Sequence, residues 1–115
     1  MAELKEIKKD EFLMREGEKS FEMYHLKSGS LGVYKLKGAV EKQIGTIAAG
    51  ELVGEMSFLD NMPRCATIRA LEDCELSIIP REKMEQYLEK QPAWLKALHG
   101  TLVDRLRKAN QKIRV

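Results

Sequence analysis

Short runs of alternating apolar and polar residues fill the first two thirds of the chain and predict β-strands. Glycine-containing turns separate them, and Ser28-Gly29-Ser30 is the clearest by composition. Short strands at intervals of about ten residues with glycine turns are typical of a β-sandwich or barrel. The predicted strands lie at residues 12–14, 21–27, 31–37, 40–47, 67–71 and 75–79.

The first ten residues have a different spacing. Leu4 and Ile7 lie three apart among charged residues, which predicts one or two helical turns over residues 3–9. A short N-terminal helix is therefore expected before the first strand.

After Pro80 the apolar period changes from two to between three and four. Residues 81–90 predict a helix with Met84, Tyr87 and Leu88 on one face, and Pro92 is a suitable first residue for a second helix. The second helix carries a single apolar stripe over several turns. The stripe consists of Leu95, Leu98, Leu102, Leu106, Ala109 and Ile113.

The apolar stripe has two interpretations. The helix can fold back onto the β-rich part, or it can pair with the same helix of a second copy of the chain. A stripe this long is hard to cover within so small a domain, which favours a homodimer. The basic end of the helix, rich in Arg and Lys after Asp104, is expected from the helix dipole alone, so nucleic-acid binding is the weaker interpretation.

Composition limits the other possibilities. A chain of 115 residues predicts one domain over residues 1–115, with a β-rich part at 11–79 and C-terminal helices at 81–113. The net charge of +2 is too small to predict electrostatic binding of nucleic acid. No apolar run is long enough for a membrane span, and the N-terminus lacks the apolar core of a signal peptide. Two cysteines outside a CxxC arrangement indicate reduced thiols in a cytoplasmic protein. A disulfide between them is the alternative.

The stretch from Gly50 to Ala70 contains the residues most suited to ligand binding. Gly54 has no side chain to block a ligand, and Glu55 can accept a hydrogen bond from a sugar hydroxyl. Pro63 fixes the backbone before Arg64, whose planar guanidinium matches two phosphate oxygens. One acid, one guanidinium and nearby small residues with accessible amides would suit a ribose joined to a singly charged phosphate.

Gly54-Glu55 followed by Pro63-Arg64-Cys65-Ala66-Thr67-Ile68 resembles the phosphate-binding cassette of cyclic nucleotide-binding domains. That family includes the bacterial catabolite activator and the regulatory subunits of protein kinase A. Glu16-Gly17-Glu18 and the run 23–34 are similar to the first turns and strands of the family, so the resemblance extends along nearly the whole chain. It implies a mainly β fold: a β-roll of jelly-roll type, flanked by a short N-terminal helix and a long C-terminal helix.

The resemblance also implies a role for each matching residue. Glu55 would accept the ribose 2′-hydroxyl, Arg64 would pair with the equatorial phosphate oxygens, and Gly54 and Met56 would offer amides or close approach. Cys65 and Ala66 would give backbone amides to the phosphate.

Two positions bear on the purine base, and they leave the choice open with a slight preference for adenine. A thiol at Cys65 is a poor substitute for the hydroxyl that helps some relatives hold guanine, so cyclic AMP is the expected ligand and cyclic GMP the alternative. Asn110, aligned near the base, suits an adenine edge but also fits a solvated residue near a helix end.

Catalytic chemistry is not indicated. His25 and His99 are far apart in different kinds of element, which argues against a metal-dependent jelly-roll enzyme, and no G-x-S-x-G turn is present. We therefore expect a binder rather than an enzyme.

Three hypotheses result. The first is a regulatory module that binds a cyclic mononucleotide and moves its C-terminal helix. The second is a ligand-free interaction domain of the same fold, which dimerises through that helix. The third is binding of another signalling ligand, such as a cyclic dinucleotide. The helix-turn-helix that follows this domain in the catabolite activator does not fit after Ile113, so no direct DNA recognition is expected.

Overall fold

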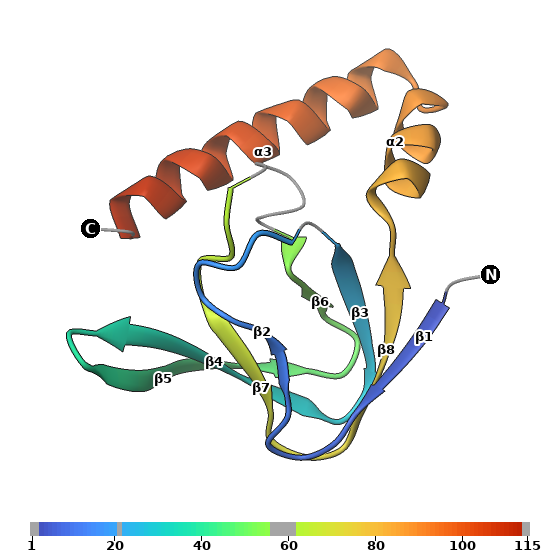
Figure 1. Ribbon diagram of the computed structural model, residues 1–115. Coiled ribbons are helices and arrows are strands. Elements are labelled where there is room, and N and C mark those ends of the chain that lie inside the picture. The colour runs from blue at the N-terminus through green and yellow to red at the C-terminus, as the bar shows by residue number, and fades with distance from the viewer. Residues whose placement is uncertain (1–2, 21, 56–61, 114–115) are drawn as a thin grey trace.

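In the described part of the chain, two antiparallel four-stranded sheets enclose the core, and two helices follow them (Figure 1). The computed structural model describes residues 3–20, 22–55 and 62–113. One sheet has the strand order β1-β8-β3-β6 and the other the order β2-β7-β4-β5. The strands are β1 (Glu3–Ile7), β2 (Phe12–Met14), β3 (Met23–Ser28), β4 (Ser30–Lys37), β5 (Val40–Ala48), β6 (Leu52–Val53), β7 (Thr67–Ala70) and β8 (Cys74–Ile79).

The predicted mainly β fold is confirmed, and so are the six predicted strands, within one or two residues at their ends. Leu26, Leu31, Val53 and Leu76 are the largest fully buried side chains, and they lie between the two sheets. Their inward direction follows from the alternation of the strands. The two-residue strand β6 was not predicted because so short a segment shows no period.

The predicted N-terminal helix is wrong. Residues 3–7 form β1, which pairs with β8 in the register Glu3↔Ile78 to Ile7↔Cys74. A helix would have put Leu4 and Ile7 on one face, whereas Ile7 is buried and Leu4 is exposed. The hydrogen bonds of the β8 edge decide the conformation of this segment, and the apolar spacing alone did not contain that information.

The predicted turn at Ser28-Gly29-Ser30 is confirmed. Gly29 has a φ of +96°, and a Cβ there would lie 2.6 Å from the Asp73 carbonyl oxygen. Only glycine tolerates both the positive φ and the close carbonyl oxygen. Glycine is therefore required at the turn that connects β3 to β4.

Both predicted helices are present, as α2 (Arg81–Glu89) and α3 (Ala93–Ile113). Met84, Tyr87 and Leu88 share one side of α2, and with Leu95 and His99 of α3 they line a common groove. Leu98, Leu102 and Leu106 are each 42–50% exposed, so this part of the apolar stripe is not covered within the described chain. None of the described helices combines the length and apolar character that a membrane span requires.

Candidate functional site

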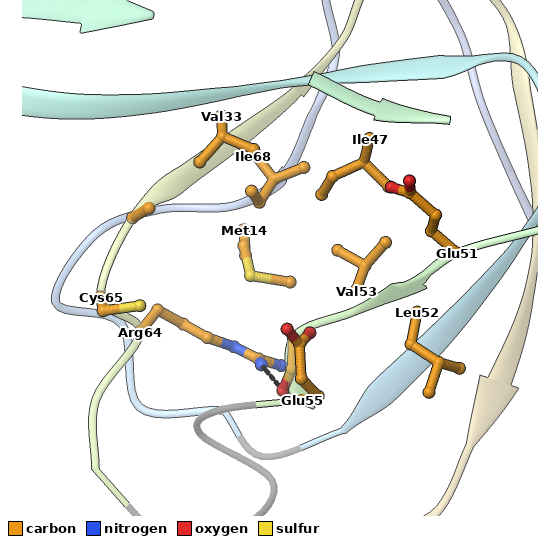
Figure 2. A pocket seen from close by; sticks show the side chains of 12 residues that line it. Met14, Val33, Ile47, Glu51, Leu52, Val53, Glu55, Arg64, Cys65 and Ile68 are labelled. Atoms are coloured by element: carbon orange, nitrogen blue, oxygen red, sulfur yellow. Dashed lines mark hydrogen bonds between the residues drawn. The ribbon is translucent and has the colours of Figure 1, made fainter. Parts of the chain in front are cut away.

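A hollow of about 300 Å³ lies against the sheet β2-β7-β4-β5 and the segments that flank residues 56–61 (Figure 2). Five of the predicted site residues line it, namely Gly54, Glu55, Arg64, Cys65 and Ala66. The cassette residues that are ten apart in sequence therefore meet at one site. Met56 lies outside the described residues.

One side of the hollow is apolar. Met14, Val33, Ile47, Val53 and Ile68 contribute to it from five different strands. The strand alternation that builds the core also turns these side chains toward the hollow. This wall suits the flat, weakly polar face of a ligand. Arg64 and Glu55 lie at the lower side in Figure 2, whereas the Glu51 carboxylate lies beside Ile47.

The Arg64 side chain is almost completely buried, with 2% of its surface exposed. Its Nε donates to Ser20 Oγ at 2.9 Å, Nη1 donates to the Gly54 carbonyl oxygen at 3.0 Å, and Nη2 donates to the Glu22 carbonyl oxygen at 2.7 Å. These contacts use three of the five N–H donors of a guanidinium. Arg64 is thus a structural bridge between three segments as well as a lining residue.

Gly54 has a φ of +79°, and a Cβ there would lie 2.5 Å from Arg64 Nη1. The sequence predicted a glycine that lets a ligand approach. In the structure, the group that comes close is the guanidinium of Arg64, and only glycine leaves room for it.

Burial lowers the pKa of Arg64, while Tyr24, Glu18 and Glu22 act in the opposite direction. The guanidinium stays charged at neutral pH because its ordinary pKa is far above that range. Burial also raises the pKa of Tyr24, and Glu22 contributes in the same direction. A permanent positive charge is therefore held at the base of the hollow.

Among the described residues, two acids line the hollow, and the sequence predicted only one of them. Glu55 lies at the hollow with Arg64, and among the described residues no ion pair within 4.0 Å joins the two. Glu51 was missed, and its Oε2 accepts a hydrogen bond from the Ala48 amide at 3.1 Å. Glu51 is thus engaged in its own turn, so Glu55 is the better candidate for a ligand acceptor.

Three peptide carbonyls of the site are held by neighbouring groups. The Gly54 oxygen accepts from Arg64 Nη1, the Arg64 oxygen accepts from the Gly17 amide at 2.8 Å, and the Cys65 oxygen accepts from Lys35 Nζ at 2.6 Å. All peptide bonds described are trans, so the N–H of each peptide points opposite to its carbonyl. The amides of Glu55, Cys65 and Ala66 are oriented by these contacts.

The remaining candidate residues contribute less. Asn110 lies in α3, but its side chain is outside the described part of the structure, so its predicted place near a base stays a prediction. Cys65 is half-buried and Cys74 is buried, and both are free thiols. In residues 3–20, 22–55 and 62–113, no three His, Cys, Asp or Glu side chains gather as metal ligands.

Residues 4–91 match the family model described as a cyclic nucleotide-binding domain. The cyclic AMP receptor protein of Thermus thermophilus is 33% identical over 92 residues, which are 79% of this chain and 43% of that protein. A cAMP-dependent protein kinase regulatory subunit of Mycosarcoma maydis is 31% identical over 80 residues, 67% of this chain and 15% of that protein. The chain thus spans less than half the length of these relatives.

Solved structures show the same likeness. The EAL enzyme Bd1971 in its halfsite-occupied form has a TM-score of 0.84 and 30% identity, over 96% of this chain and 99% of that chain. The catabolite activator protein of Thermus thermophilus has a TM-score of 0.78 and 27% identity, over 97% of this chain and 53% of that chain. The architecture of two facing sheets followed by helices is shared with both.

Replacing Arg64 tests its structural role. Arg64→Ala leaves the Gly54 and Glu22 carbonyls without their partner, so we expect the free energy of unfolding to fall by about 2–4 kcal/mol in urea titrations. Arg105→Ala, on the exposed part of α3, is the matched control and should change the value by less than about 0.5 kcal/mol. Equal effects of the two substitutions would contradict the bridging role.

Proposed function

The chain belongs to the cyclic nucleotide-binding domain family, and we propose that it binds a cyclic mononucleotide in the hollow beside Arg64. Cyclic AMP is the ligand we place first and cyclic GMP second. The observation that carries the proposal is the meeting of Glu55, Arg64 and the oriented amides of Cys65 and Ala66 at one hollow.

The phosphate would lie against Arg64. Two N–H donors of the guanidinium are not used in its bonds to Ser20, Gly54 and Glu22, and these would serve the equatorial oxygens. The amides of Cys65 and Ala66 would add uncharged donors. Because the guanidinium is already held by three protein contacts, little side-chain entropy is lost when the ligand binds.

The ribose would lie against Glu55, whose carboxylate would accept from the 2′-hydroxyl. Gly54 and Met56 would provide close approach or amides. The Glu51 carboxylate is engaged with the Ala48 amide, which supports Glu55 as the acceptor.

The purine would lie along the apolar wall, with Asn110 of α3 proposed near the base edge. A hollow of about 300 Å³ lies at the small end of the range for small-molecule sites, about 300–1,000 Å³. This size favours a mononucleotide over a cyclic dinucleotide of twice the mass.

We assign the chain a regulatory role rather than a catalytic one. The curated relatives are named as a receptor protein and a kinase regulatory subunit. In the cAMP-bound form of the EAL enzyme, which has a TM-score of 0.80 and 29% identity, the likeness covers 29% of that chain, so the matching part is a portion of a larger enzyme. The signal would be relayed by a shift of α3 between two positions as it covers the ligand.

A second candidate function is a ligand-free interaction domain that dimerises through α3. The exposed leucines of α3 favour it, because three large apolar side chains on one face of a helix are typical of an interface. Dimerisation is also compatible with nucleotide binding, so the two properties need separate tests.

Thermal unfolding with ligand tests nucleotide binding. At one hundred times its dissociation constant, a ligand adds about 2.7 kcal/mol to the stability of the folded state. For a domain of this size, the unfolding temperature should rise by several degrees with cyclic AMP. A panel with cyclic GMP and cyclic di-GMP should give a smaller rise and none, respectively. No rise with either mononucleotide at millimolar concentration would reject the proposed function.

A double comparison tests the role of Glu55. Wild-type protein should bind 2′-deoxy cyclic AMP roughly tenfold to a hundredfold more weakly than cyclic AMP, because a hydrogen bond to a charged group is lost. In Glu55→Gln that difference should shrink to a few-fold, as measured by isothermal titration calorimetry.

Glu51→Gln is the matched control, since both acids line the hollow but Glu51 bonds to its own turn. It should keep the full preference for the 2′-hydroxyl. If Glu51→Gln removes the preference and Glu55→Gln keeps it, the assignment of the ribose acceptor is wrong.

Light scattering tests association through α3. Wild-type protein should have the mass of a dimer, and the double variant Leu102→Glu, Leu106→Glu should have that of a monomer, because two buried charges would oppose the interface. The control Thr101→Glu, Arg105→Glu changes exposed positions beside the stripe and should stay dimeric. An unchanged mass in the leucine variant would argue against this interface.

A further inference from the structure

Lys35 of β4 contacts the cassette from the side of the sheet. Its Nζ donates to the Cys65 carbonyl oxygen at 2.6 Å, and its side chain is only 21% exposed. The sequence did not predict Lys35 as a residue of the site, because its hydrogen-bond partner is a backbone atom thirty residues away.

The ammonium group of Lys35 is itself held in place by Glu16. Glu16 Oε2 lies 4.0 Å from Lys35 Nζ. The other carboxylate oxygen of Glu16 accepts from the Leu36 amide at 3.1 Å, and the Glu16 amide donates to Thr67 Oγ1 at 2.9 Å. Glu16 is thereby tied to both β4 and β7, so the lysine is fixed between an anchored carboxylate and the cassette.

We propose that Lys35 is a positioning residue for ligand binding, which acts by fixing the peptide plane between Cys65 and Ala66. In a trans peptide the carbonyl and the next N–H point in opposite directions. With the Cys65 oxygen bound to Lys35, the Ala66 N–H is turned the other way, and Ala66 lines the hollow. Lys35 thus prepares an anion-binding amide without contacting the ligand.

This inference rests on the proposed function, because the amide needs an anionic ligand to act on. A bond from a charged ammonium to a carbonyl is stronger than one between neutral groups, and partial burial strengthens it further. An unheld carbonyl at this place could instead turn toward the hollow, where its negative end would face the phosphate. Preorganisation of the amide is therefore expected to affect affinity more than folding.

The test compares cyclic AMP affinity in wild type, Lys35→Met and Lys35→Arg by isothermal titration calorimetry. Lys35→Met has a similar length but no donor, and it should bind roughly tenfold more weakly, the scale of one hydrogen bond. Lys35→Arg keeps a charged donor and should restore affinity to within about threefold. Lys37→Met, at an exposed position of the same strand, is the matched control and should bind like wild type.

Salt and NMR distinguish positioning from simple charge attraction. The loss in Lys35→Met should persist between about 0.1 and 1 M salt, because an exposed charge effect is screened over that range and a fixed peptide plane is not. In amide spectra, the Ala66 resonance should shift on ligand addition in wild type and shift less in Lys35→Met. A loss that disappears at high salt, or an unchanged Ala66 response, would overturn the inference.

Two further outcomes separate this inference from the proposed function. If wild type binds cyclic AMP and Lys35→Met binds it equally well, the positioning role is wrong and the proposed function stands. If wild type binds no cyclic mononucleotide, both the positioning role and the proposed function are wrong.

Should Lys35→Met fail to fold in thermal scans, Glu16→Gln serves instead, because it keeps the acceptor for the Leu36 amide and removes the charge beside Lys35. It should weaken binding by a few-fold, and wild-type affinity in it would count against the inference.

Discussion

The buried guanidinium of Arg64 is the interaction on which the site depends. It joins the loop after β2, through Ser20 and Glu22, to Gly54 at the end of β6. A buried charge is costly unless it is hydrogen-bonded, so these acceptors must stay where they are. Gly54 is required by the same arrangement, since any Cβ there would meet the guanidinium. The charge that suits a phosphate is therefore also a reason why the hollow keeps its shape.

Around this charge, the protein orients backbone groups by binding their carbonyls. Gly17 holds the Arg64 oxygen, and Lys35 holds the Cys65 oxygen. Each contact turns one amide in the opposite direction, as trans peptide geometry requires. A site made in this way needs few special side chains, because a loop amide and one strand lysine hold the peptides. The small residues Cys65 and Ala66 then leave those amides accessible.

Helix α3 is covered less completely by the rest of the described chain than the strands of the two sheets are. The two sheets bury a continuous apolar core, whereas Leu98, Leu102 and Leu106 of α3 stay exposed. An element with few buried contacts can move at a lower cost than a strand of the core. The hollow therefore rests on the buried core, whereas α3 carries an apolar face that the described chain leaves uncovered.

The sequence by itself determined six of the eight described strands, the turn at Ser28-Gly29-Ser30 and the two helices, because apolar period and turn chemistry are local properties of the chain. The cassette was identified by its resemblance to a family pattern. The conformation of residues 3–7 was decided by the free edge of β8, so the apolar spacing gave a helix where the structure has a strand. The roles of Glu51 and Lys35 were likewise invisible in the sequence. The partner of Lys35 lies thirty residues away, and Glu51 bonds to Ala48 in its own turn but reaches the hollow only through the packing of several strands. Local pattern thus fixed which residues could form a site, and tertiary contacts decided which atoms face it.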